Sequence, residues 1–275
     1  MIACYKNYIL MDKTTKNNPA ALQKISHLPL LMIIKKTAKF IINGHIKGSM
    51  NYLIAEFMNY LSQYKMENHF FCNLCKIEST YFLHSSNNKR ILYNSICPNC
   101  SSRKRHRGLY EIYKNIIKKI ESPKILHFAP EPVFYNLFQP FEYITADLEL
   151  TDVDLQLDIG NIDCKTASFD LILCNHVLEH VSDDDKALKE LFRILKPSGT
   201  VIITVPGDWM SEKTINYDQP DSNGHYRNYG LNFLIVLDDI FTSVESIDLY
   251  KYDCIYNLSL GLTHQHDLAF LCRKD

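Results

Sequence analysis

The alternation of strand and helix patterns from residue 124 onwards restricts the fold more than any other feature of the sequence. Short apolar segments such as "KILHFA" (124–129), "YITADL" (143–148) and "FDLILCN" (169–175) are separated by segments with helical spacing. Strands that are separated by helices predict a doubly wound α/β sheet. "FDLILCN" is apolar on both faces, which is typical of a central strand in a parallel sheet.

Seven strands and three helices are expected in this part of the chain. The other four strands are "VDLQLD" (153–158), "TVIITVP" (200–206), "SVESIDLYKYD" (243–253) and "DLAFLCRKD" (267–275). The helices are "PVFYNLFQ" (132–139), the segment starting at the acids 183–185, and "GLNFLIVLDDIF" (230–241). Acids favour the positive end of a helix, and Gly199 is expected to act as the stop signal of the second helix.

The charge is divided unevenly along the chain. Residues 1–125 carry 20 Lys and Arg against 6 Asp and Glu, whereas residues 126–275 carry 10 against 25. The net charge of −1 therefore hides a basic and an acidic part, which indicates separate modules. We expect a basic, mainly helical segment at 1–66, a small metal-binding domain at 67–122 and the α/β domain at 123–275. The basic part is a candidate surface for an anionic partner.

The most apolar stretch near the start, residues 28–42, is too short to cross a membrane. It is interrupted by Lys35 and Lys36, and a spanning helix needs about 20 apolar residues. A partly buried helix is expected, and a basic amphipathic segment that contacts a membrane surface or a partner is the alternative. No signal-peptide pattern opens the sequence, and nine cysteines without one predict a cytoplasmic protein without a disulfide framework.

Four of the cysteines have a spacing that is typical of zinc sites. Cys72 and Cys75 form one C-x2-C pair, and Cys97 and Cys100 form another. Four thiolates are a tetrahedral ligand set for structural zinc, and they leave no open position for catalysis. The segment between the pairs predicts a β-hairpin that turns at Ser-Ser-Asn-Asn. We therefore predict a zinc ribbon that depends on the metal for folding; four free cysteines are the alternative.

The segment after the second cysteine pair predicts an amphipathic helix over residues 101–120. Its apolar residues with helical spacing are Leu109, Ile112, Tyr113, Ile116 and Ile117. The basic residues at its start, which could bind phosphates, are Arg103, Lys104, Arg105 and Arg107. The alternative is a solvated helix start that packs the ribbon onto the next domain.

Residues 176–180, His-Val-Leu-Glu-His, match the H-x-x-E-H order of the inverted zinc peptidases. Such a site requires both histidines on a helix, together with a third ligand. The strand "FDLILCN" runs directly into His176, which indicates the carboxyl end of a strand instead. We therefore expect Glu179 and His180 to lie in a turn or short helix, where they hold the segment in place.

The strand ends supply the candidate site residues, because ligands of doubly wound sheets bind outside the carboxyl ends of the strands. The candidates are His127 to Glu131, Asp147, Asp158, Asn175, His176, and Pro206 to Trp209. Asp147 and Asp158 could instead be turn or capping residues.

Together, these motifs resemble the class I S-adenosylmethionine-dependent methyltransferases. The resemblance rests on the order of the strands, the acids Asp147 and Asp158, and the segments "SFDLILCNHVLEHV", "ELFRILKPSGTVIITVP" and "LAFLCRK". It covers residues 124–275. "CPNCSSRKRHR" followed by "ILHFAPEP" is similar to a bacterial subgroup in which a cysteine-paired ribbon precedes the methyltransferase domain, and this extends the resemblance back to about residue 70. The resemblance implies a Rossmann-like seven-stranded sheet and S-adenosyl-L-methionine as cofactor.

The resemblance also implies a role for each strand end. Asp147, with Leu148 beside it, would bind the ribose hydroxyls, Asp158 and the backbone N–H of Ile159 would bind the adenine, and Asn175 and His176 would line the methionine end.

The first loop, "HFAPEP", departs from the family's pattern of an acid followed by glycines. His127 stands at the position of the acid and Ala129 at that of the first glycine. Our hypothesis is that Glu131 binds the methionine ammonium group and that Ala129 permits a close approach of the backbone, with Phe128 and Pro130 completing the loop. A site that no longer binds the cofactor is the alternative.

The acceptor site is expected after the fifth strand, where the loop 217–230 is long enough to suggest a function. Its neighbourhood offers candidate substrate-binding residues, namely Asp208, Trp209, His225, Arg227 and Tyr229. His176 and His225 are the candidate catalytic bases, and a positioned base contributes roughly 10²–10⁴-fold. An ordinary surface loop is the alternative.

The predicted function is S-adenosylmethionine-dependent methyl transfer to a small molecule. The subgroup resemblance suggests a sugar or glycan precursor as acceptor. One alternative is an RNA methyltransferase whose basic zinc-ribbon half binds RNA, with affinity that falls steeply with salt. Another is a non-catalytic binding module, which the missing glycines suggest.

Overall fold

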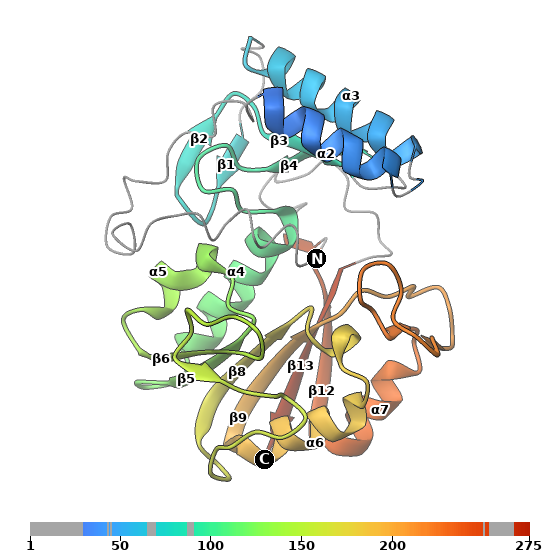
Figure 1. Ribbon diagram of the computed structural model, residues 1–275. Helices are drawn as coiled ribbons and strands as arrows, with labels where there is room; N and C mark the ends of the chain where they lie inside the picture. Colours follow the sequence, from blue (N-terminus) through green and yellow to red (C-terminus); the bar gives the residue numbers. More distant parts are fainter. Residues whose placement is uncertain are drawn as a thin grey trace. The chain divides into compact units, whose positions relative to one another are not determined.

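The computed structural model describes residues 30–42, 44, 46–64, 70–86, 91–249, 251–252 and 267–275 (Figure 1). The chain divides into two compact units. The first comprises Met1–Gly108 with Tyr252–Leu262, and the second comprises Leu109–Lys251 with Thr263–Asp275.

The second unit is built on a seven-stranded sheet. Its strands are β5 (Lys124–Phe128), β6 (Glu142–Asp147), β7 (Leu155–Gln156), β8 (Phe169–Asn175), β9 (Leu195–Thr204), β12 (Ser243–Asp248) and β13 (Leu268–Lys274). They lie in the order β7-β6-β5-β8-β9-β13-β12. The first five are parallel, and β13 lies antiparallel between β9 and β12. The five parallel strands have the 3-2-1-4-5 order of a doubly wound Rossmann sheet, so the predicted α/β fold is confirmed.

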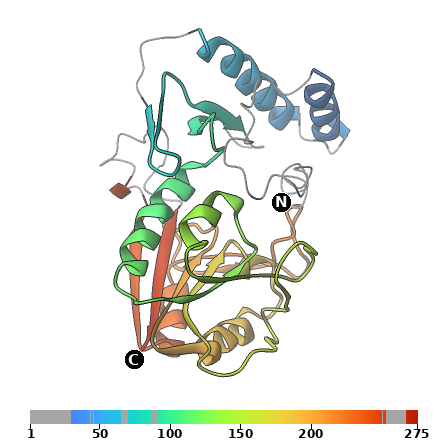
Figure 2. The same cartoon turned by 90° about the vertical axis from the view of Figure 1, so that its left-hand side faces the viewer.

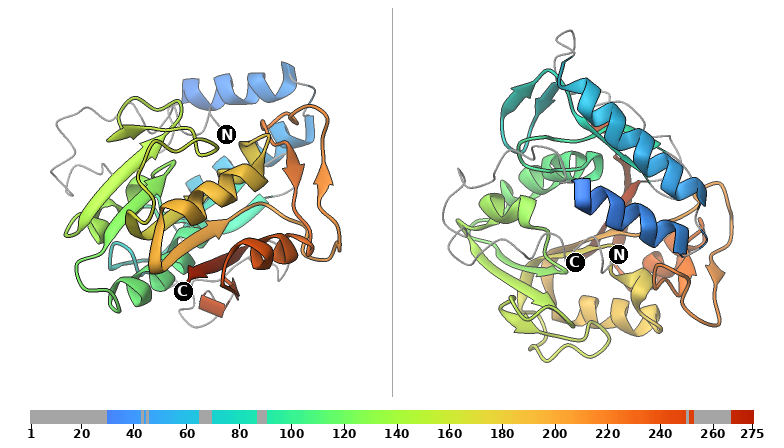
Figure 3. Two further views of the ribbon diagram at one scale, coloured as in Figure 1. Left: turned by 90° about the horizontal axis from the view of Figure 1, so that it is seen from below. Right: turned by 45° about the horizontal axis from the view of Figure 1, so that its top comes forward.

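Helices cover both faces of this sheet (Figures 1 and 3). They are η3 (Pro132–Phe134), α5 (Tyr135–Phe138), η4 (Leu178–His180), α6 (Asp184–Ile194), α7 (Phe233–Ile240) and the part of α4 (Lys104–Ile117) from Leu109 onwards. Side chains alternate between the two faces along each strand. Leu126 and Ile172 therefore share one core with α6 and α7. His127 faces the aromatic rings of Phe134 and Phe138 on the other side.

The end of α6 differs from the prediction. The helix ends at Ile194, and β9 begins at Leu195, so Gly199 lies inside a strand and is not a helix stop signal. Pro197 explains the early end, because the residue before a proline is disfavoured in helical conformation. Gly199 is required by close packing instead, since a Cβ atom there would lie 2.8 Å from the carbonyl oxygen of Lys196.

In the described part of the first unit, two helices precede four short strands and the start of α4. The helices are α2 (Leu30–Ile42) and α3 (Ile46–Ser62), and the strands are β1 (Phe70–Cys72), β2 (Ile77–Ser79), β3 (Leu83–Ser86) and β4 (Ile91–Ile96), which pair as β1-β2 and β3-β4 (Figure 2). The antiparallel pairing of β3 with β4 bears out two paired strands between the cysteine pairs. Ser85 and Ser86 of the predicted Ser-Ser-Asn-Asn turn lie inside β3 instead, because they pair with Leu92 and Ile91, and the rest of that turn lies outside the described residues. Asn59 ties α3 to this hairpin, because its side chain accepts a hydrogen bond from the His84 backbone N–H at 2.6 Å and donates one to the His84 carbonyl oxygen at 3.2 Å.

The apolar stretch near the start forms helix α2, as expected for the part of residues 28–42 that the structure describes. Its Ile34, Ile41 and Ile42 side chains are exposed. No helix among the described residues combines the length and the apolar character that crossing a membrane requires. Contact of this segment with a membrane surface stays a prediction.

Candidate functional site

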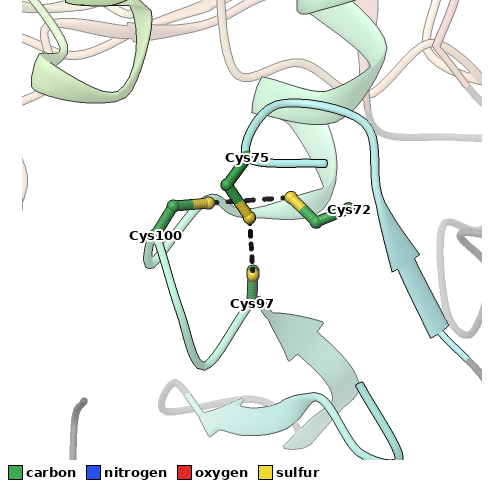
Figure 4. A group of neighbouring side chains, drawn as sticks. All are labelled: Cys72, Cys75, Cys97 and Cys100. Atoms are coloured by element: carbon green, nitrogen blue, oxygen red, sulfur yellow. Dashed lines mark hydrogen bonds between the residues drawn. The ribbon is translucent and has the colours of Figure 1, made fainter. Parts of the chain in front are cut away.

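The four paired cysteines converge on one point between β1 and β4 (Figure 4). The Sγ atoms of Cys72 and Cys100 are 3.6 Å apart, and those of Cys75 and Cys97 are 3.7 Å apart. All four sulfur atoms lie within 4.8 Å of one another. Tetrahedral zinc with Zn–S bonds of about 2.3 Å would set its sulfur ligands roughly 3.8 Å apart. The donor atoms and their spacing therefore fit a zinc ion.

The two C-x2-C turns have the same backbone geometry. The N–H of Lys76 donates to the carbonyl oxygen of Cys72 at 2.8 Å, and the N–H of Ser101 donates to that of Cys97 at 2.9 Å. Lys76 and Ser101 both adopt left-handed backbone conformations, with φ of 60° and 59°. Non-glycine residues rarely adopt this conformation, so its occurrence after both cysteine pairs indicates a shared requirement to orient the sulfur atoms.

The protonation of four adjacent thiols is mutually dependent. Hydrogen bonds among the sulfur atoms, first of all with Cys100, lower the pKa of Cys72 and raise the pKa of Cys97 far above the ordinary range of a thiol. The apolar side chains around the cluster are few, chiefly Phe70 and Phe82. A divalent cation would favour the thiolate form at all four positions.

Two of the four basic residues after the second cysteine pair are buried. Arg107 is 0% exposed, and its guanidinium group donates to the carbonyl oxygens of Ser95 and Ser102. Lys104 is also buried, whereas Arg103 is exposed. The predicted alternative, a solvated helix start, does not describe Arg107, because its side chain is buried. Phosphate binding by the exposed Arg103 stays a prediction.

The candidate cofactor site begins at the carboxyl end of β5. Ala129 has a φ of 48°, a left-handed conformation that glycine adopts more easily than alanine. Glu131 is buried, and its Oε2 accepts a hydrogen bond from Nδ2 of Asn175 at 3.1 Å. Asn175 Nδ2 is also 2.7 Å from the hydroxyl group of Tyr113 on α4. The loop after β5, the end of β8 and helix α4 therefore meet at the buried side chain of Asn175.

His127 lies behind this loop and is fully buried. Its Nδ1 is 2.8 Å from the hydroxyl group of Tyr143 on β6. Burial lowers the pKa of His127 to about 4, and the nearby carboxylate of Glu131 offsets this only in part. The imidazole is therefore neutral at neutral pH, and His127 is a core residue.

The His127 pKa makes a testable contribution to acid unfolding. Below an ordinary pKa of about 6.5 the unfolded chain binds a proton at this residue, whereas the folded chain does so only near pH 4. We expect the free energy of unfolding to fall by about 3 kcal/mol between pH 6.5 and pH 4 relative to a His127→Gln variant. Urea unfolding of both proteins across this range measures the difference, and parallel curves would show that His127 titrates normally.

Asp147 and Asp158 both make turns at their strand ends. Oδ1 of Asp147 accepts hydrogen bonds from the N–H groups of Glu149 and Leu150, and Oδ1 of Asp158 accepts one from Gly160. In each carboxylate, Oδ2 has no hydrogen-bond partner among the described residues. Both acids therefore act as turn residues, which was the predicted alternative. The second carboxylate oxygen of each can still bind a ligand. Leu148 is exposed beside Asp147, and Ile159 is buried beside Asp158.

The His-Val-Leu-Glu-His segment ends β8 and forms a single turn, η4, as expected. His176 has a φ of 52°, and its Nδ1 lies 3.2 Å from Oε1 of Glu179. His180 follows in the same turn, and its ring is 4.8 Å from the ring of His225 in the long loop. The structure thus brings both predicted bases to the η4 turn, where His176 contacts Glu179 and His225 contacts His180.

The substrate-binding candidates fall into two groups. Asp208 is exposed and His225 is half-buried, so both can reach a ligand. Arg227 is buried and donates to the carbonyl oxygens of Val181 and Ser182, and the Tyr229 hydroxyl group donates to Oδ2 of Asp184. These contacts secure the loop to η4 and α6.

Trp209 belongs with the buried group. Its ring packs against Phe270, and a Cβ atom at Gly207 would lie 2.6 Å from it. A role in acceptor binding stays a prediction for all five candidates. Trp209, Arg227 and Tyr229 are buried and make structural contacts as well.

Two residues of this neighbourhood were absent from the predicted site. Tyr113 was predicted only as part of an apolar helix face, and no signal in the sequence links it to Asn175, 62 positions away. Glu179 carried a signal, the H-x-x-E-H spacing, but the matching helix is absent from the part of the chain that the structure describes.

One segment of the chain matches a known protein family. Residues 140–203 match the family described as "Methyltransferase domain". This segment contains β6, β7, β8, η4, α6 and nearly all of β9, so it includes Asp147, Asp158, Asn175 and His176. The match bears out the predicted enzyme class, an S-adenosylmethionine-dependent methyltransferase.

Comparison with individual proteins adds the following. A search of curated proteins finds no match. Among solved structures, the chain is similar to an S-adenosylmethionine dependent methyltransferase from Mesorhizobium loti, at 11% identity and a TM-score of 0.45 over 61% of this chain and 98% of that one. It is also similar to 1,6-didemethyltoxoflavin-N1-methyltransferase from Burkholderia thailandensis, at 16% identity and a TM-score of 0.44 over 62% of this chain and 78% of that one. Likenesses this distant do not decide the fold, which follows from the strand order.

Proposed function

We propose that this protein transfers the methyl group of S-adenosylmethionine to a small-molecule acceptor, and that a structural zinc ion holds its cysteine ribbon. The observation that carries the proposal is the doubly wound sheet whose strand ends bear Glu131, Asp147 and Asn175, within and beside the segment that matches a methyltransferase domain. Ligands of such sheets bind at this edge.

The residues present fit the cofactor. The left-handed conformation of Ala129 turns the chain sharply after β5, and the buried carboxylate of Glu131 suits a cationic ammonium group. Asp147 keeps one carboxylate oxygen without a partner among the described residues, which suits a ribose hydroxyl group. Bound S-adenosylmethionine supplies a methyl group that is already activated on a sulfonium. The protein's contribution is then to align the acceptor and to exclude water, and alignment alone is worth about 7–11 kcal/mol.

The burial of two basic residues near the cysteine ribbon favours a small acceptor over RNA. Arg107 and Lys104, which a phosphate-binding surface would need exposed, are buried. The suggestion of a sugar or glycan precursor rests on the subgroup resemblance alone, and a screen of such acceptors for methylation would test it.

Titration with S-adenosylhomocysteine tests the cofactor site. We expect one binding site per chain, and an affinity about 10-fold lower in Asp147→Asn, because a neutral amide replaces a charged acceptor of the ribose hydroxyl groups. Asp163→Asn, which changes an exposed acid outside the strand ends, should bind like the unmodified protein. Absence of binding in the unmodified protein would reject the proposed function.

A further inference from the structure

The turn after β8 and the long loop create a second cluster of potential metal ligands, distinct from the cysteines. Ligand atoms of Glu179, His180 and His225 all lie within 4.8 Å of one another. Glu179 and His180 come from η4, and His225 comes from the loop that returns between β10 (Ile215–Asn216) and β11 (Arg227–Asn228). The Tyr226 N–H donates to the Glu179 carbonyl oxygen at 2.7 Å, which holds loop and turn together.

Two polar atoms in this cluster are buried without a hydrogen-bond partner. Glu179 is 0% exposed, and its Oε2 has no partner among the described residues. Nε2 of His225 is likewise buried and unpartnered in this part of the chain. A buried polar group without a hydrogen-bond partner destabilises the folded state, and a charged one does so more strongly. Two such atoms within one small cluster indicate side chains that are arranged to bind a ligand.

The histidines are oriented as metal ligands are. Nδ1 of His180 is 3.0 Å from the carbonyl oxygen of Gly224. A carbonyl oxygen can only accept, so Nδ1 carries the proton and Nε2 presents its lone pair towards Glu179, whose Oε1 lies 4.0 Å away. Metal-binding histidines typically donate their second N–H to a carbonyl oxygen or carboxylate in this way.

His225 and His176 complete the arrangement. Nδ1 of His225 faces Oδ2 of Asp221 at 3.9 Å, which leaves Nε2 directed inward. Nδ1 of His176 lies 3.2 Å from Oε1 of Glu179. This contact occupies one carboxylate oxygen, so Oε2 is the oxygen that remains for a ligand.

We propose that Glu179 Oε2, His180 Nε2 and His225 Nε2 bind a divalent transition-metal ion. Two imidazoles and a carboxylate are a common ligand set for zinc and iron. An ion with bonds of about 2.0–2.2 Å to each atom would draw the three ligands together to roughly 3–3.5 Å. His176 acts as a positioning residue for Glu179.

Three protein ligands leave coordination positions open. The His180 and His225 side chains are 31% and 16% exposed, whereas the Oε2 atom of Glu179 and the Nε2 atom of His225 are buried, so the site lies just below the surface. If the proposed function holds, an oxygen of the acceptor can occupy an open position, where the metal lowers the pKa of a hydroxyl group. The inference therefore favours methylation of oxygen over nitrogen or carbon.

Calorimetric titration with Zn²⁺ tests the site in full-length protein that has been saturated with zinc at the cysteines and freed of excess metal. We expect one further equivalent to bind. His225→Ala and His180→Ala, which change partly exposed residues, should each lower this affinity at least 10-fold, and Glu179→Gln should do the same if it folds. Glu245→Gln, which changes an exposed acid far along the chain, is the matched control. Circular dichroism confirms that each variant is folded.

Two outcomes would overturn the inference: no further zinc bound, or an unchanged affinity in His180→Ala and His225→Ala, which would mean adventitious binding elsewhere. S-adenosylhomocysteine binding is measured on the same samples. Loss of zinc binding with intact S-adenosylhomocysteine binding affects only the metal site, whereas failure to bind S-adenosylhomocysteine affects the proposed function and leaves the metal result standing.

Discussion

Replacing Cys97 by serine should abolish binding of the ribbon's zinc ion and unfold the segment that contains β1–β4. The cluster around the cysteines contains few apolar side chains, chiefly Phe70 and Phe82, and the strands are 3–6 residues long. Structural zinc contributes about 10–16 kcal/mol of folding free energy in small zinc domains. We expect the few apolar contacts of this segment to be too weak to keep it folded without that contribution. This is the largest effect that we expect from any single substitution.

Two measurements check this result. Metal analysis should find one zinc ion fewer per chain in Cys97→Ser, and hydrogen exchange should show lost protection in residues 70–86 and 91–103 while the seven-stranded sheet stays protected. Cys164→Ser changes a partly buried cysteine outside the cluster and serves as the matched control. A Cys97→Ser protein that keeps its zinc and its protection would contradict the ribbon.

The second large effect concerns Glu131. We expect Glu131→Gln to weaken S-adenosylmethionine binding about 100-fold, because removing one partner of a buried charge pair costs roughly 2–5 kcal/mol. Glutamine keeps the shape of the side chain and an oxygen that can accept from Asn175. The loss would therefore report the charge and not a cavity.

Methylthioadenosine separates this role from a general disturbance of the site, because it lacks the amino acid part of the cofactor. Its affinity should be the same in the unmodified protein and in Glu131→Gln. Glu142→Gln, which changes an exposed residue at the start of β6, controls for the change of net charge. Equal losses for both ligands, or no loss for either, would remove Glu131 from the ammonium site.

The strands were predictable because their information is local. "FDLILCN" coincides with β8, and "YITADL" overlaps β6 except at its ends. The prediction failed at the junction of α6 and β9, where Gly199 was taken for a helix stop signal. Gly199 is instead required because a Cβ atom there would collide with Leu195 and Lys196 of the same strand. A glycine in the sequence does not show which of these two local requirements it meets.

The candidate site was predictable only as a set of strand ends. The carboxyl ends of parallel strands meet at one edge of a sheet, so Ala129, Glu131 and Asn175 could be assigned to a common region. Arg227 could not be assigned in the same way. The polar composition of its loop suggested a ligand contact for this residue. Its guanidinium group is instead buried and donates to the carbonyl oxygens of Val181 and Ser182.

The sequence by itself determined the zinc-ligand candidates, the alternation of strands and helices, and the acids at the strand ends. Each of these depends on spacing within a few residues, which the local geometry of turns, strands and helices imposes. Only the tertiary structure decided which distant groups meet. It joined Tyr113 to Asn175, and it brought His225 from the long loop to Glu179 and His180. Such contacts depend on how long segments close over the sheet, and residue spacing does not specify that closure.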